Sequence, residues 1–252
     1  MKFTKPKLNL IYFILLNCIL GCSQDTKRQE IAMELIVPKG KIIFKDNFEN
    51  LNNWHPEGFI EGVTLVEKGY MRLDCSSSEQ GGIGCMAFCK QDFPDSICIE
   101  FDFYMEEKNG LVLVFSGMKG LNGEDAITGV PPRKGLFDDY TGENALIRSY
   151  HVSISRYDDE GNHTGVSNWR RNPGLHLIAQ GDDYCKDIRT KYHIAIIKSG
   201  PTCQLQVDGK VASGFTDPQV LPDKIPASGK VGFRSIGRKA IARISNFKVT
   251  AL

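Results

Sequence analysis

The sequence predicts an all-β domain in which two antiparallel sheets pack face to face. Many short segments alternate apolar and polar residues with a period of two, as half-buried strands do. Asp208-Gly209 joins two such segments and is a strong hairpin signal. No convincing amphipathic helix follows residue 40. About a dozen short strands with glycine-rich turns are typical of a two-sheet sandwich.

The N-terminal segment has the features of a targeting signal, which is excluded from the fold. Three lysines precede an apolar stretch over residues 8–20, which is too short to span a bilayer comfortably. The stretch ends in ILGC, residues 19–22, which resembles the lipobox of bacterial lipoproteins, whose cysteine is lipidated. We therefore expect a signal peptide over residues 1–21, a lipid on Cys22 and a polar tether over 22–39. An ordinary secretory signal is the alternative.

This interpretation places the protein in the bacterial cell envelope, anchored by lipid to the outer membrane. Removing residues 1–21 takes away three lysines and no acidic residue, so the formal net charge falls from +1 to −2. A nearly neutral chain gives no broad electrostatic attraction for nucleic acid, and the lipid is the only membrane contact that we expect. Any anion-binding site must therefore be local.

The cysteines leave the disulfide pattern open. Cys18 lies in the signal and Cys22 is the lipid site, which leaves six of the eight cysteines in the domain. An oxidising envelope permits disulfides, but sequence alone does not choose among the possible pairings, and buried free thiols are equally compatible. The cysteine and histidine spacing contains no metal-binding motif, and no cofactor is expected.

The predicted strands follow one another along a single domain, residues 40–252. Alternation favours strands at 41–46, 63–68, 97–105, 110–117, 147–156, 192–198, 203–215 and 230–237, the seventh containing the Asp-Gly hairpin. The segment 166–183 reads as extended backbone interrupted by Pro173 and Gly174, which end one strand and permit a tight bend.

Several segments together resemble a known family. FKDNFENLNNW and GKVGFRSIGRKAIARISNFKV resemble the first and last strands of a concanavalin A-like jelly roll. GLNGEDAI, DDYTGENALIRSYHVSISR and SNWRRNPGLHLIAQGDD are similar to a family of such domains of unknown function, found in bacterial clusters that degrade rhamnogalacturonan and related uronic-acid polysaccharides. The resemblance implies a jelly-roll fold and an acidic oligosaccharide as the partner, but no settled reaction.

The strand at 147–156 has one small polar face. Alternation puts His151 among serines on that face and Tyr150, Val152, Ile154 and Arg156 on the other. Small side chains suit the floor of a sugar-binding groove into which a histidine projects, whereas the apolar face suits the core. A hydrogen-bonded histidine on an ordinary solvent face is the alternative.

The stretch VSNWRRNPGLHLIAQGDD concentrates hydrogen-bonding groups. Asn168 and Arg170 share one side of an extended segment, and Trp169 and Arg171 share the other. A guanidinium binds a carboxylate through two parallel hydrogen bonds, an amide binds sugar hydroxyls, and an exposed indole stacks on a sugar ring. Alternation also assigns His176 to the groove side. The alternative is a solvated loop whose arginines pair with nearby acids.

Elimination from a uronate is the chemistry that these residue types fit. The reaction needs a cation on the carboxylate, a base for the α-proton and an acid for the leaving oxygen. Arg170 could supply the cation and His151 or His176 the base. Tyr140 is the better candidate for the acid, because alternation places the other candidate, Tyr150, opposite His151. The leaving group is a sugar for a polysaccharide lyase and water for an oligosaccharide dehydratase.

Two adjacent acidic residues, Glu124 and Asp125, follow a predicted strand. They could bind the substrate or hold the arginines in place.

Two other functions compete with elimination. A glycoside hydrolase is disfavoured, because the paired carboxylates of that chemistry are absent and Glu100 and Asp102 lie among bulky apolar residues. A non-catalytic carbohydrate-binding lipoprotein is the main alternative, and exposed aromatic side chains would support it.

Overall fold

The computed structural model describes residues 33–65, 69–76, 84–221, 224–237 and 239–252. The signal peptide, Cys22 and most of the expected tether lie outside these residues. The described part forms one compact unit, Met33–Leu252. Within it, no helix is long and apolar enough to cross a membrane.

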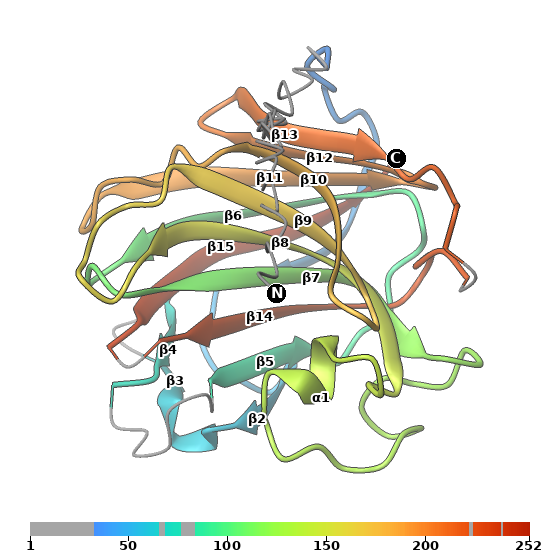
Figure 1. Cartoon of the computed structure of the whole chain (residues 1–252), viewed down its shortest axis with the longest axis horizontal. Coiled ribbons are helices and arrows are strands. Elements are labelled where there is room, and N and C mark those ends of the chain that lie inside the picture. Colours follow the sequence, from blue (N-terminus) through green and yellow to red (C-terminus); the bar gives the residue numbers. More distant parts are fainter. Residues whose placement is uncertain (1–32, 66–68, 77–83, 222–223, 238) are drawn as a thin grey trace, which may run out of the picture. The chain divides into compact units, whose positions relative to one another are not determined.

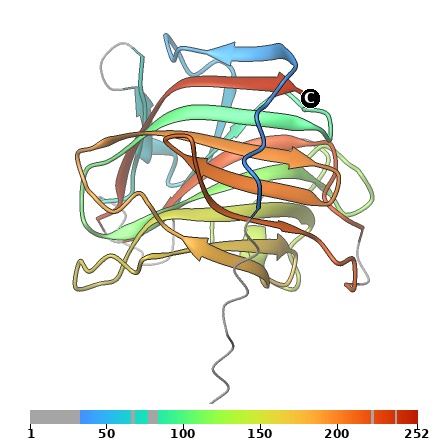
Figure 2. The same cartoon turned by 90° about the horizontal axis from the view of Figure 1, so that it is seen from above.

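Two antiparallel sheets make up the unit, and they confirm the all-β sandwich (Figures 1 and 2). We call them sheet A and sheet B. Sheet A has the order β13 (Lys210–Thr216), β12 (Thr202–Val207), β11 (Lys191–Ser199), β6 (Ile97–Met105), β15 (Ile241–Ala251), β4 (Met71–Asp74) and β3 (Val63–Leu65), with β1 (Lys41–Asp46) also paired to β15. Sheet B has the order β10 (His176–Asp182), β9 (Val166–Asn172), β8 (Ile147–Tyr157), β7 (Gly110–Gly120), β14 (Lys230–Ile236), β5 (Cys85–Cys89) and β2 (Trp54–Gly58).

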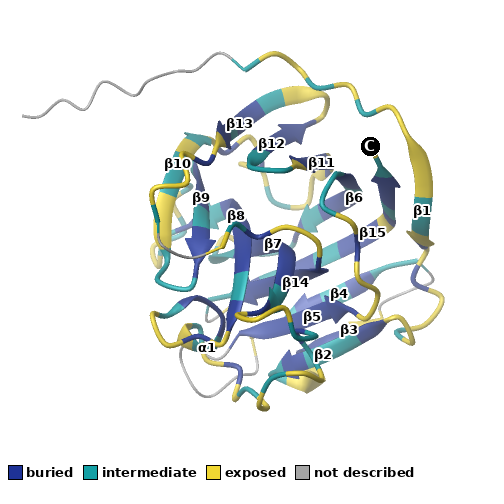
Figure 3. Ribbon diagram, turned by 90° about the vertical axis from the view of Figure 1, so that its right-hand side faces the viewer, coloured by how far each residue is buried: buried dark blue, intermediate teal, exposed yellow. Residues whose placement is uncertain are grey.

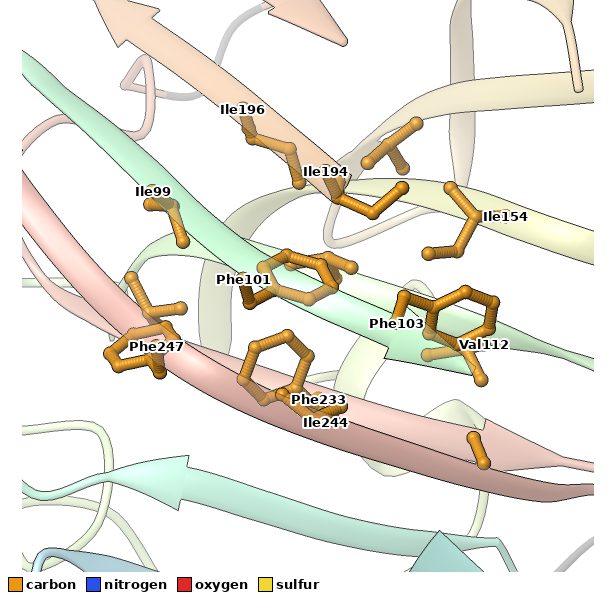
Figure 4. Packing of buried hydrophobic residues seen from close by; sticks show 14 of the residues in the cluster. Ile99, Phe101, Phe103, Val112, Ile154, Ile194, Ile196, Phe233, Ile244 and Phe247 are labelled. Carbon is orange, nitrogen blue, oxygen red and sulfur yellow. The ribbon is translucent and has the colours of Figure 1, made fainter. Parts of the chain in front are cut away.

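The core lies between the two sheets. Phe101 of sheet A meets Phe233 of sheet B edge to face, with ring centroids 4.9 Å apart (Figure 4). Burying each phenylalanine stabilises the fold by about 1.5–3 kcal/mol. The central strands of both sheets are mostly buried, and exposed residues gather in the connections and in the strands β1 and β10 (Figure 3). Alternation is confirmed in β8, where Tyr150, Val152 and Ile154 enter this core.

The Asp-Gly hairpin is also confirmed. β12 and β13 pair directly on either side of Asp208 and Gly209. Both turn residues have positive φ, 49° and 75°, as a two-residue hairpin turn requires.

The connection between β7 and β8, residues 121–146, folds over the outer face of sheet B. It contains the short helix α1 (Asp138–Thr141). Ala126 and Tyr140 of this connection form a second apolar cluster with Phe88, Leu113 and Phe115, whose side chains point away from the main core. The connection therefore covers part of the outer face and leaves the remainder, over β8 and β9, for a site.

The described end of the expected tether lies against sheet A. The side-chain amide of Gln204 donates to the carbonyl of Glu34 at 2.8 Å, and that of Gln206 donates to the carbonyl of Ile36 at 2.8 Å. The N–H of Ile36 donates to Gln204 Oε1 at 3.1 Å. Two glutamines thus bind the main chain of this segment much as a neighbouring strand would.

Candidate functional site

A pocket of about 240 Å³ opens on the outer face of sheet B, beside the 121–146 connection. One row of side chains crosses this face through paired positions on β7, β8, β9 and β10, namely Phe115, His151, Arg170 and Leu177. A neighbouring row brings Arg234, Leu113 and Ser153 together. Both rows follow from strand alternation and register.

One half of the pocket is polar. His151, Ser153, Arg156, Asn168 and Arg170 line it. The structure therefore brings together three of the residues that the sequence assigned to the site, His151, Asn168 and Arg170. Asn168 Oδ1 accepts from Gln180 at 2.8 Å, which leaves the NH₂ group of Asn168 as the donor for a sugar hydroxyl.

The other half is apolar and comes from four separate segments. Leu111, Leu113, Phe137, Leu175 and Ile236 line it. A sugar ring has an apolar face as well as hydroxyl groups, so a pocket with one apolar and one polar wall suits it. The volume lies below the range of about 300–1,000 Å³ for drug-sized ligands, so the pocket has room for about one sugar ring.

Two arginines give the pocket positive charge. Arg170 donates through NH1 to the carbonyl of Leu175 at 2.6 Å, and Arg156 donates through NH1 to the carbonyl of Val166 at 3.0 Å. Desolvation and the positive charge of Arg156 both lower the pKa of Arg170. Within the described ranges, neither guanidinium has a carboxylate at ion-pair distance. An anionic ligand would relieve this uncompensated charge.

His151 lies at the bottom of the pocket. It is almost fully buried, and desolvation, followed by the charge of Arg170, lowers its pKa to about 3. The imidazole is therefore neutral near pH 7. Its Nδ1 lies 2.9 Å from Asn172 Nδ2, which also donates to Ser149 Oγ at 2.9 Å. These contacts fix the ring and leave Nε2 for the pocket.

Trp169 and Arg171 do not reach the pocket. Trp169 is fully buried, and its indole N–H donates to Ser213 Oγ at 2.9 Å. Arg171 is buried on the same core side, 3.3 Å from Asp217. The alternation that places Arg170 outward turns both residues inward, so Trp169 offers no stacking platform.

His176 also lies away from the pocket. It pairs with Arg171, whose side chain faces the core, rather than with a residue of the outer face. An extra residue in β10 between Leu177 and Ala179 shifts the register, so alternation carried through the strand assigns the wrong faces. The structure therefore corrects the assignment of His176, and Leu175, just before the strand, lines the pocket instead.

Tyr140 does not line the pocket; it lies in the second apolar cluster with Leu113, and Phe137 packs against that cluster. Its hydroxyl donates to Glu57 Oε2 at 3.0 Å, and Glu57 also accepts two hydrogen bonds from Arg133 at 2.6 and 2.8 Å. Desolvation and the neighbouring charge of Glu57 raise the pKa of Tyr140. The phenol is buried, donates to Glu57 and does not line the pocket as His151 does, so the geometry does not provide it as the acid.

Glu124 and Asp125 shape their own loop. Glu124 accepts from the backbone and side chain of Asn122 at 2.9 and 3.0 Å. Asp125 lies 2.8 Å from Lys230 Nζ. Desolvation raises the pKa of Asp125, but the hydrogen bonds from Lys230 and the backbone outweigh it and hold that pKa well below its usual value. Neither carboxylate lines the pocket.

Arg156 is the charged residue that strand alternation misassigned. Alternation puts it on the core face, but β8 carries an extra residue opposite β7, between Ile154 and Tyr157. Ser155 takes a positive φ of 52° at this bulge, and the side chain of Arg156 reaches the pocket. No motif in the sequence marks the bulge.

Glu100 and Asp102 lie on sheet A and bind basic side chains there. Lys248 Nζ is 3.1 Å from Glu100, and His193 Nδ1 is 3.1 Å from Asp102. Among the residues with described positions, no group of three or more His, Cys, Asp or Glu side chains is arranged to hold a metal ion.

Comparison with known proteins places the chain among uncharacterised relatives. A family model described as a domain of unknown function, DUF1961, matches residues 41–249. The uncharacterized protein YesU of Bacillus subtilis is 29% identical over 163 residues, which cover 62% of this chain and 73% of YesU.

Solved structures share the fold. A Bacillus subtilis protein of unknown function with a galectin-like fold superposes with a TM-score of 0.74 at 23% identity, covering 86% of this chain and 98% of that one. A lectin from Bauhinia forficata in complex with GalNAc has a TM-score of 0.54 at 15% identity, over 83% and 97% of the two chains. A Bacillus licheniformis β-glucanase has a TM-score of 0.54 at 12% identity, over 85% and 100%.

Proposed function

The chain belongs to the DUF1961 family, and from its pocket we propose that it binds a uronate-containing oligosaccharide and eliminates from it. One observation carries the proposal. Arg156 and Arg170 present uncompensated positive charge beside a buried neutral histidine, in a pocket of about 240 Å³. The fold is shared with a lectin and a β-glucanase, so it is compatible with both sugar binding and sugar chemistry.

The arginines would hold the sugar carboxylate. Arg170 is anchored by Leu175, so its remaining N–H groups are already oriented when the ligand arrives. Neutralising the carboxylate makes the adjacent C–H more acidic, which is the first requirement of elimination. The apolar wall at Leu113 and Phe137 would contact the opposite face of the ring.

His151 would move the proton. A neutral imidazole with Nε2 unprotonated can take the proton next to the carboxylate and then return it to the leaving oxygen. The C–O bond breaks as the C=C bond forms, and the proton leaves with the departing alcohol or water. A pocket for about one sugar favours reaction at a chain end over cleavage within a chain.

A second function, binding without turnover, is favoured by the contact between Asn172 and His151. An amide nitrogen donates only, so Nδ2 at 2.9 Å from Nδ1 makes Nδ1 the acceptor and leaves the proton on Nε2. His151 is then a hydrogen-bond donor to the sugar. If the side-chain amide of Asn172 is rotated by half a turn, its Oδ1 faces His151 instead of Nδ2. The Nδ1–H of His151 then donates to Oδ1, and Nε2 carries no proton and can act as the base. The tautomer of His151 therefore separates the two functions.

The decisive experiment incubates the protein with saturated and unsaturated uronate oligosaccharides from pectin and ulvan, and follows mass and ultraviolet absorbance. Loss of one water without chain cleavage identifies a dehydratase, and new double bonds with shorter products identify a lyase. Binding without any product supports the second function. If no acidic oligosaccharide binds, both functions are wrong.

His151→Ala is the matched variant for turnover. We expect it to abolish product formation while changing affinity only slightly, because the histidine acts mainly in the transition state. If His151→Ala turns over at the wild-type rate, another residue carries the chemistry.

A further inference from the structure

Two buried thiols meet where the two sheets join. Cys75 directly follows β4 of sheet A, and Cys85 is the first residue of β5 in sheet B. Their Sγ atoms are 3.0 Å apart, and both residues are fully buried. A disulfide bond is about 2.0 Å long, so a shift of about 1 Å would join the sulfurs. We propose that Cys75 and Cys85 form a disulfide that links sheet A to sheet B.

Main-chain contacts from both sides hold the pair together. The N–H of Cys85 donates to Cys75 Sγ at 3.2 Å, and the Cys75 thiol lies 3.2 Å from the carbonyl of Ser235 on β14. The N–H of Cys75 donates to the carbonyl of Ala240 at 3.0 Å. The two sulfurs are therefore fixed by secondary structure rather than by chance rotamers.

The surroundings also select which sulfur reacts first. The hydrogen bond from Cys85 lowers the pKa of Cys75, and the positive charge of Arg234 contributes in the same direction. The same hydrogen bond, together with desolvation, raises the pKa of Cys85. The thiolate is the nucleophile in disulfide exchange, so Cys75 attacks and Cys85 resolves.

The other four described cysteines lack this arrangement. Within the described ranges none of their sulfurs contacts a second sulfur, and burial raises the pKa of each thiol, for example to about 11 for Cys89 and about 12 for Cys98 and Cys203. Buried thiols of this kind are inert. Of the pairings that the sequence leaves open, the structure thus favours one.

The reaction needs a disulfide oxidant, such as oxidised glutathione. The Cys75 thiolate attacks one sulfur of the oxidant, which forms a mixed disulfide and releases one thiol. The Cys85 thiolate then attacks Cys75 Sγ and releases the second thiol. The pair loses two protons and two electrons, and the oxidant becomes two thiols. Because both sulfurs are buried in the finished domain, we expect exchange late in folding, after Cys75 and Cys85 have come together and before the domain closes over them.

The test refolds the full chain with a mixture of reduced and oxidised glutathione, blocks free thiols and maps peptides without reduction. Cleavage after Arg72, Glu79 and Lys90 puts Cys75 on one fragment and Cys85 with Cys89 on the next. We expect these two fragments to remain linked. Cys89→Ala should keep the link, and Cys85→Ala should lose it.

Thermal unfolding gives a readout that does not depend on a variant. The disulfide would close the short loop between Cys75 and Cys85 and so lower the conformational entropy of the unfolded chain. Reducing the disulfide should therefore lower the Tm of the refolded protein by about 5 °C or more. If Cys75 and Cys85 are both alkylated after refolding with oxidised glutathione, or if either is linked to a different cysteine, the proposal is wrong.

Discussion

Arg170 is the residue whose substitution tests ligand charge most directly. A lysine keeps the positive charge but loses the planar fork, so Arg170→Lys should weaken binding of uronate oligosaccharides about tenfold or more. Calorimetric titration measures the change. Arg148→Lys is the matched control, because Arg148 lies outside the pocket and donates to the carbonyl of Leu121. Equal affinities for the two variants would contradict the proposed carboxylate contact.

His151 makes stability depend on pH. Its pKa is about 3 in the folded protein, below the ordinary 6.5. Between these two pH values His151 is therefore protonated in the unfolded chain and neutral in the folded chain. Stability is therefore unaffected above about pH 6.5 and is lost as the pH falls toward about 3. Between about pH 7 and pH 5 the loss is about 2 kcal/mol.

Urea unfolding of the wild type and His151→Gln at both pH values isolates this contribution. From about pH 7 to pH 5, the free energy of unfolding should fall by about 2 kcal/mol more in the wild type than in the variant. Parallel losses in the two proteins would show that His151 is not buried in its neutral form.

Residue-level reasoning succeeded where the backbone is regular. Alternation placed His151, Asn168 and Arg170 on one face, and the structure confirms that arrangement. It failed for Arg156 and His176 because a bulge adds a residue to β8 and to β10, and strict alternation does not hold across such an addition. A bulge depends on the partner strand, which the local sequence does not specify.

At the scale of elements, the 121–146 connection decides where the pocket ends. Asp125 ties it to sheet B through Lys230, so Asp125→Asn should lower the free energy of unfolding by about 1 kcal/mol and leave ligand affinity nearly unchanged. The carboxylate of Glu124 bonds only within its own loop in the described structure, so Glu124→Gln should leave the free energy of unfolding nearly unchanged. Urea unfolding and ligand titration measure both effects.

The opposite pattern would restore a ligand role for this loop. If Asp125→Asn retains full stability but loses affinity, its carboxylate contacts the sugar. Sequence reasoning found this pair of acids but not their function, because Lys230 is more than 100 residues away along the chain. The apolar wall was missed for the same reason, since Phe137 and Ile236 meet only in the folded domain.

For the whole molecule, the sandwich was predictable because its signals are local. Period-two alternation and one Asp-Gly turn predict strands and a hairpin, and the number of strands then requires two sheets. The sequence did not show which outer face stays open. That depends on residues 33–39 packing against sheet A and residues 121–146 covering part of sheet B, and both are contacts between distant segments.

Attachment to the membrane is the remaining proposal at this scale, and it concerns residues outside the described structure. If ILGC at residues 19–22 is a lipobox, Cys22→Ala should abolish both lipid labelling and fractionation with membranes in a bacterial host. Cys18→Ala, four residues upstream, removes a thiol from the expected signal and should leave both properties intact. Both residues precede the described sandwich in the chain, so both variants should keep the β-dominated circular dichroism spectrum. Membrane fractionation of Cys22→Ala at the wild-type level would rule out the lipid anchor while leaving the pocket and its proposed ligand unaffected.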